Sequence, residues 1–168
     1  MEIKYLKLER VTKENFDPYG EVLGLEEEGK LVEMLPHLRY WANNAYLGEI
    51  NEKLDMGLIV NTLDEHGYEF EKLERHPKTW EIFFPLEGQS VFVMAPPNKD
   101  RDYSGIQFKE QIKAFLISGN LGVGLCKGTW HWAPRPIGEF SKMALLRKGE
   151  LTEPTEFVEL GMKVKIVL

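Results

Sequence analysis

Short apolar segments separated by glycine and proline are the feature that most constrains the fold of this 168-residue chain. Residues 3–8 alternate apolar and charged side chains, which is the pattern of a strand with one face in solvent. Residues 119–128 hold too many glycines for a helix, and their spacing matches no phosphate-binding loop. Only residues 12–16 and 44–54 are candidate helices. The pattern predicts an all-β protein, an antiparallel barrel or sandwich, with one or two short helices.

The expected strands follow from apolar runs that end at turn residues. Residues 56–63 are mainly apolar, so we expect a buried strand there, and Cys126 is expected to be a small buried side chain. The full set of expected strands is 3–8, 39–47, 56–63, 69–76, 81–86, 89–95, 112–118, 140–147 and 157–168.

Length and charge limit the classes of function. The length favours one domain, residues 1–168. A net charge of -6 argues against nucleic-acid binding, and no apolar run is long enough for a membrane helix. The first residues do not resemble a signal peptide, so we expect a cytoplasmic protein. The expected partners are a small-molecule substrate and a second copy of the chain in a homodimer, with no nucleic acid and no membrane.

The residues that carry chemistry gather in two segments. In an extended chain, Glu74 and His76 lie on one face and Arg75 on the other, where an ion pair on the outer surface is expected. Pro77 interrupts the strand, so Glu81 can restart on the side of His76. A second histidine, His131, stands between two tryptophans. We expect the two segments to meet inside a small barrel.

Two kinds of chemistry fit these side chains. Imidazole nitrogen and carboxylate oxygen suit a divalent ion such as nickel, zinc, manganese or iron, and His76, Glu81 and His131 are the candidate ligands. Without a metal, a carboxylate beside an imidazole can act as a general acid and base, with His76, His131 and Glu74 as the candidates. His66 lies in a turn and is expected to be exposed.

The spacing of these residues resembles the two sequence signatures of the cupin superfamily. His76, Glu81 and Gly88 match the first signature, except that Glu74 stands where metal-binding cupins have another histidine. Gly128 and His131 resemble the second signature. The resemblance implies a double-stranded β-helix, a jelly-roll barrel, with a site inside it.

Within the cupins, the chain resembles the ureidoglycolate lyase family over residues 11–147. The segments that carry the likeness are 16–22 (FDPYGEV), 73–77 (LERHP), 84–88 (FPLEG), 113–119 (KAFLISG) and 128–131 (GTWH). The chain departs from the family pattern in three places: Trp132 replaces a second histidine, Leu146 replaces an aspartate, and Glu81 replaces an uncharged amide.

The resemblance implies an enzyme that splits ureidoglycolate into glyoxylate and urea. A base would take the hydroxyl proton while the carbon–nitrogen bond breaks, and an acid would protonate the leaving nitrogen. Arg39 and Trp130 are the candidate substrate-binding residues. Two alternatives stay open: a cupin that binds a small carboxylate or sugar without turnover, which Trp132 favours, and a different metal-dependent cupin reaction.

Overall fold

A computed structural model describes residues 2–24, 30–35, 38–42, 54–97, 106–148 and 155–168. The short helices are α1 (Lys13–Phe16) and α2 (Ile106–Glu110). The strands up to the middle of the chain are β1 (Ile3–Arg10), β2 (Gly20–Gly24), β3 (Lys30–Leu35), β4 (Leu38–Ala42), β5 (Leu54–Thr62) and β6 (Glu69–Arg75). The later strands are β7 (Glu81–Ala95), β8 (Lys113–Ser118), β9 (Leu121–Leu125), β10 (Trp130–Lys148) and β11 (Glu156–Val167).

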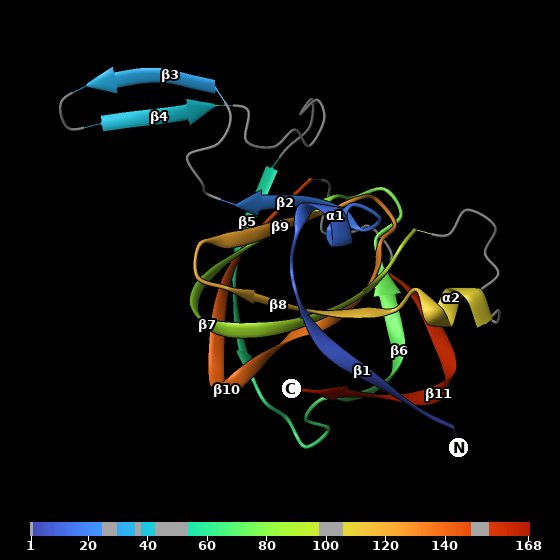
Figure 1. Ribbon diagram of the computed structural model, residues 1–168. Coiled ribbons are helices and arrows are strands. Elements are labelled where there is room, and N and C mark those ends of the chain that lie inside the picture. The colour runs from blue at the N-terminus through green and yellow to red at the C-terminus, as the bar shows by residue number, and fades with distance from the viewer. Residues whose placement is uncertain (1, 25–29, 36–37, 43–53, 98–105, 149–154) are drawn as a thin grey trace.

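Pairing of these strands closes part of the molecule into a ring. The main sheet has the order β2-β9-β7-β8-β1-β11-β6-β10-β5, and β7 also pairs with β10. The additional pairing joins β7, β8, β1, β11, β6 and β10 in a closed circuit, which Figure 1 shows as a barrel. β1 is parallel to both β8 and β11 and bridges them. Strands β3 and β4 form a separate two-stranded sheet.

Two long strands connect the ring to the rest of the sheet. The second half of β7 pairs with β8, whereas its first residues pair with β9. β10 pairs with β7 over most of its length, and its second half, from Phe140 to Lys148, also pairs with β5 on its other side. Gly88 lies where β7 changes partners, at φ +74°, and a Cβ there would stand 2.7 Å from the carbonyl oxygen of Phe140. A glycine is therefore needed at this bend.

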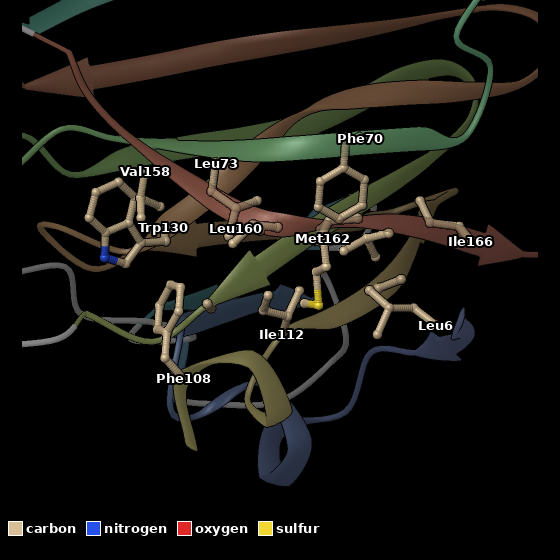
Figure 2. Packing of buried hydrophobic residues seen from close by; sticks show 14 of the residues in the cluster. Leu6, Phe70, Leu73, Phe108, Ile112, Trp130, Val158, Leu160, Met162 and Ile166 are labelled. Atoms are coloured by element: carbon tan, nitrogen blue, oxygen red, sulfur yellow. The ribbon is translucent and has the colours of Figure 1, made fainter. Parts of the chain in front are cut away.

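The two faces of β7 and β8 carry separate apolar cores. Val91 and Val93 belong to a cluster with members from all six ring strands, which we call the ring core and which Figure 2 shows in part. Phe92 and Met94, which alternate with them, belong to a second core with residues of α1, β2, β8, β9 and β10. Neighbouring residues of one strand thus enter different cores.

The predicted all-β, cupin-like barrel with one or two short helices is confirmed. The predicted helical turn after Thr12 is present, and the Thr12 side chain accepts a hydrogen bond from the backbone of Asn15 at 3.2 Å. The candidate helix at 44–54 falls almost entirely outside the described residues, and Leu54 begins β5. Within the described ranges, neither helix has the length and apolar character that a membrane-spanning helix needs.

Three local expectations were wrong. The strand expected at 140–147 begins at Trp130, because pairing with β7 resumes after a register shift between Trp132 and Arg135, around Pro134, and Pro136 itself lies opposite Ser90. The strand expected to be buried at 56–63 is β5, the end strand of the main sheet, and Met56 is 76% exposed. Cys126 is exposed in the turn after β9.

Candidate active site

Three strands bring the candidate residues together. Glu74 is on β6 and His131 is the second residue of β10, and the two are direct cross-strand partners. His76 directly follows β6, and its carbonyl oxygen accepts a hydrogen bond from the backbone N–H of Gly128 at 3.0 Å, just before β10 begins. Glu81 is the first residue of β7, after the interruption at Pro77. The predicted meeting of two distant segments is therefore present in the structure.

The side chains form a compact, partly buried cluster. Nε2 of His131 lies 3.6 Å from Oε2 of Glu81 and 3.7 Å from Oε1 of Glu74, and Nε2 of His76 lies 3.8 Å from Oε1 of Glu81. The two imidazole rings are 5.6 Å apart between centroids. His131 and Glu81 are each 4% exposed, whereas the side chain of Glu74 is 30% exposed. Glu74 therefore faces the more open side of the cluster.

A backbone carbonyl fixes the protonation of His131. Its Nδ1 lies 3.1 Å from the carbonyl oxygen of Thr129, which can only accept a hydrogen bond, so Nδ1 carries the proton. Burial lowers the pKa of His131 to about 4, against the opposing effect of this hydrogen bond, so the ring is neutral at pH 7. Nε2 then presents a lone pair toward the carboxylates of Glu74 and Glu81. At neutral pH these two contacts are not ion pairs.

Burial also alters Glu74, since loss of solvent raises the pKa of its carboxyl group above the usual value, and Lys72 opposes this only in part. A carboxyl group with a raised pKa can exchange a proton closer to neutral pH.

The edge of the Phe92 ring packs against His131 at 5.9 Å between centroids and an interplanar angle of 81°. This aromatic contact limits rotation of the imidazole.

The donor set fits a divalent metal ion. His76, Glu81 and His131 each offer one ligand atom, and these atoms all lie within 4.8 Å of one another. Ligand atoms that lie about 2.1 Å from a shared ion are about 3 to 4.2 Å apart. The two Glu81 oxygens lie 3.6 and 3.8 Å from Nε2 of His131 and Nε2 of His76, within this range. A positive ion would also offset the repulsion between the Nε2 lone pair of His131 and the nearby carboxylates. The hydrogen bond from Nδ1 to the Thr129 carbonyl is of the kind that orients metal-binding histidines.

Other predicted residues lie elsewhere. Trp130 is 1% exposed and belongs to the ring core, beside Phe108, on the face of β10 opposite to His131, as Figure 2 shows for its surroundings. The structure therefore does not bring this candidate substrate-binding residue to the histidines. Arg39 is on β4, and its side chain lies outside the described part of the chain.

The prediction for Arg75 was half correct. Its side chain points away from His76, as alternation requires, and pairs with Glu156 at 2.6 Å. However, Arg75 is only 7% exposed and packs over the ring of Trp130 at 4.5 Å, so it is a buried residue and not an outer-surface one. The sequence could not show this burial, because Glu156 comes from distant β11. His66, in contrast, is exposed as predicted, with 70% of its side chain in solvent.

An open groove of about 550 Å³ lies outside the cluster, and its lining includes Trp132, Phe70 and Arg135 but none of the candidate site residues. Trp132 stacks on Phe70 at 4.8 Å and lies under the guanidinium of Arg135. The residue that replaces the second histidine of the family pattern thus points away from His131. It does not fill the space beside the cluster.

Sequence reasoning missed two contributors to the site, Thr129 and Phe92. Thr129 acts through its backbone carbonyl, for which residue type gives no signal. Phe92 is one of several apolar residues of β7, and only the pairing of β7 with β10 places it against His131.

Comparison with known proteins identifies relatives that match most of the chain. A sequence profile of the family described as ureidoglycolate lyase matches residues 3–166. A ureidoglycolate lyase of Pseudomonas paraeruginosa is 32% identical over 143 residues, which cover 77% of this chain and 75% of that protein. A ureidoglycolate lyase of Burkholderia mallei is 29% identical over 149 residues, 88% of this chain and 84% of that protein.

Among solved structures, the chain is similar to the capsular polysaccharide assembling protein CapF of Staphylococcus aureus. The TM-score is 0.48 at 16% sequence identity, over 64% of this chain and 27% of that chain.

The lowered pKa of His131 gives an expected pH dependence of stability in metal-free protein. In the unfolded chain this histidine takes up a proton near pH 6.5, but in the folded protein it does so only near pH 4, so the unfolded state binds more protons between these values. The free energy of unfolding should therefore fall as the pH drops from about 6.5 to about 4, by about 3 kcal/mol for this group.

Urea unfolding in the presence of EDTA, at a series of pH values, measures this effect. The contribution of His131 is the difference between the pH profiles of the free energy of unfolding of wild type and His131→Gln. The raised pKa of Glu74 has the opposite effect on stability, but Glu74 is present in both proteins and its effect cancels. His66→Gln is the control, because that side chain is exposed and should leave the pH profile unchanged. An equal slope in wild type and His131→Gln would contradict the assignment of a buried neutral ring.

Proposed function

We propose that this chain, which belongs to the ureidoglycolate lyase family, cleaves ureidoglycolate into glyoxylate and urea. The observation that carries the proposal is the convergence of His76, Glu81, His131 and Glu74 in a chain of this family. Relatives that bear the name of this activity align over most of their own length. The two alternatives, binding without turnover and a different metal-dependent reaction, are not favoured.

The reaction moves one proton from oxygen to nitrogen. The substrate hydroxyl loses its proton, its oxygen becomes the aldehyde oxygen of glyoxylate, the carbon–nitrogen bond breaks, and the urea nitrogen takes up a proton. A single catalytic group can therefore accept the proton from the hydroxyl oxygen and then deliver it to the urea nitrogen. Glu74 is the residue we assign to this transfer, because its carboxyl has a raised pKa and is the most exposed of the cluster.

His76, Glu81 and His131 would hold a divalent ion. Such an ion supplies a positive charge that polarises and orients substrate oxygens. In this assignment the hydrogen bond from Nδ1 of His131 to Thr129 keeps Nε2 directed toward the cluster. Glu81 faces both histidines with its two oxygens. The remaining alternative is direct acid–base work by His76 and His131 without an ion.

Formation of glyoxylate from ureidoglycolate tests the activity. Glu74→Gln keeps the size of the side chain and removes its ability to exchange a proton, so kcat should fall about 10²- to 10⁴-fold. His66→Gln is the matched control and should retain wild-type activity. If the wild-type protein produces glyoxylate no faster than buffer, with and without added divalent metal, the proposed function is wrong.

Thermal melting tests the metal assignment. Protein treated with EDTA should gain stability when Mn²⁺, Zn²⁺, Ni²⁺ or Fe²⁺ is added singly, by about 2.7 kcal/mol at a hundredfold excess over Kd. Glu81→Gln and His76→Gln should abolish this gain. Glu65→Gln removes an equal charge from a side chain that is 87% exposed and should not change it. Activity that survives EDTA, with no shift for any ion, would favour the metal-free alternative.

The chain is further proposed to form a homodimer, for which β5 offers support. The outer face of this end strand carries Met56, Leu58 and Val60, which are 76%, 64% and 55% exposed. A row of exposed apolar side chains on an end strand favours association. Light scattering should give twice the chain mass for wild type and the single mass for Leu58→Lys. Tyr5→Lys, an exposed position on β1, should remain dimeric. A wild-type monomer mass would overturn the proposal.

A further inference from the structure

Arg147 is a direct cross-strand neighbour of Glu81, one member of the cluster. It is the cross-strand partner of Glu81 on β7 and of Asp55 on β5, so the three side chains stand in one row across the sheet. Cross-strand partners point to the same face of a sheet. Arg147 therefore projects from the same face as Glu81, whose carboxylate contacts both histidines.

Packing of the neighbouring residues confirms which face this is. Met143 and Leu145, which alternate with Arg147 along β10, pack in the second core, and so does Phe83, two residues after Glu81. Leu146 and Ile82, which point the other way, belong to a separate small cluster. The face with Arg147 is thus the one that also holds Phe92, the residue in contact with His131.

The guanidinium of Arg147 has donor capacity left over. Its side chain is 16% exposed, and Nε lies 3.9 Å from Oδ2 of Asp55, too far for a hydrogen bond. Nε is buried, and among the described residues it has no hydrogen-bond partner. A buried donor without a partner is costly, so a site of this kind favours an acceptor supplied by a ligand. Arg75, by comparison, makes two hydrogen bonds to Glu156 at 2.8 and 2.6 Å.

We infer that Arg147 binds the carboxylate of the substrate. The inference rests on the proposed function, because ureidoglycolate carries one carboxylate next to the carbon at which the bond breaks. A guanidinium suits this group, since it can donate two parallel hydrogen bonds to the two oxygens. The substrate would then lie with its carboxylate at Arg147 and its reacting carbon toward Glu74 and the histidines.

Arg147 is expected to contribute to substrate binding and not to the chemical step. The carboxylate keeps its charge throughout the cleavage, so Arg147 holds substrate and transition state almost equally. Arg147→Gln should therefore raise KM about 10- to 100-fold with little change in kcat, as expected for loss of a charge-assisted hydrogen bond. Arg147→Lys keeps the positive charge but cannot donate two parallel hydrogen bonds, so its KM should lie between those of Arg147→Gln and wild type. Loss of Glu74, in contrast, acts on kcat.

Binding of two small probes tests the inference without turnover. Glyoxylate retains the carboxylate, and N-(hydroxymethyl)urea is ureidoglycolate without it. Titration calorimetry on the metal-loaded protein should show that Arg147→Gln weakens glyoxylate binding at least tenfold and leaves N-(hydroxymethyl)urea unaffected. Arg135→Gln, which changes an arginine outside the cluster, is the control. Retention of the metal-induced melting shift shows that the variant folds with its site intact.

Three results would overturn the inference: no measurable binding of glyoxylate to wild type, equal glyoxylate affinity in wild type and Arg147→Gln, or equal weakening of both probes. The last result would mean that Arg147 supports the structure of the site through Asp55. Failure of the proposed function looks different. In that case wild type releases no glyoxylate from ureidoglycolate, while the two probes still report on Arg147.

Discussion

The long pairing of β7 with β10, which resumes after each of three register shifts, is the constraint on which the rest of the structure depends. The two strands run side by side from the ring into the second part of the sheet and carry Glu81, His131 and Arg147. Glu74 and His76 lie at the end of β6, beside the start of β10. Because cross-strand register is fixed by backbone hydrogen bonds, the positions of Glu81, His131 and Arg147 are set together. The apolar residues on the opposite face of the same strands fill the ring core, so packing of that core also holds the site in place.

Electrostatics in the cluster follow from burial more than from direct ion pairing. His131 is kept neutral by loss of solvent, and its single proton is committed to Thr129. The carboxylates of Glu74 and Glu81 therefore meet a lone pair and not a positive ring. A lone pair facing two carboxylates is stabilised when a positive charge lies between them. Either a bound metal ion or a proton can supply that charge.

The sequence was sufficient to predict the convergence because two simple rules apply locally. Alternation places Glu74 and His76 on one face, and the break at Pro77 lets Glu81 join them, as the structure shows. Spacing could not reveal that Trp130 enters the ring core, since that depends on which face of β10 is turned inward. Arg147 was likewise visible only as a charged residue near the end of a strand. Its relation to Glu81 is a matter of register between segments far apart in the chain.

The parallel pairing of β1 with β11 has a consequence for the order of folding. The ring cannot close without β11, because among the described residues β1 pairs with β8 and β11, and β11 pairs with β1 and β6. During synthesis on the ribosome, the ring cannot close before β11 has emerged. Closure then requires contacts between segments that lie far apart in the sequence, so folding is expected to be slower than for helical proteins of similar size.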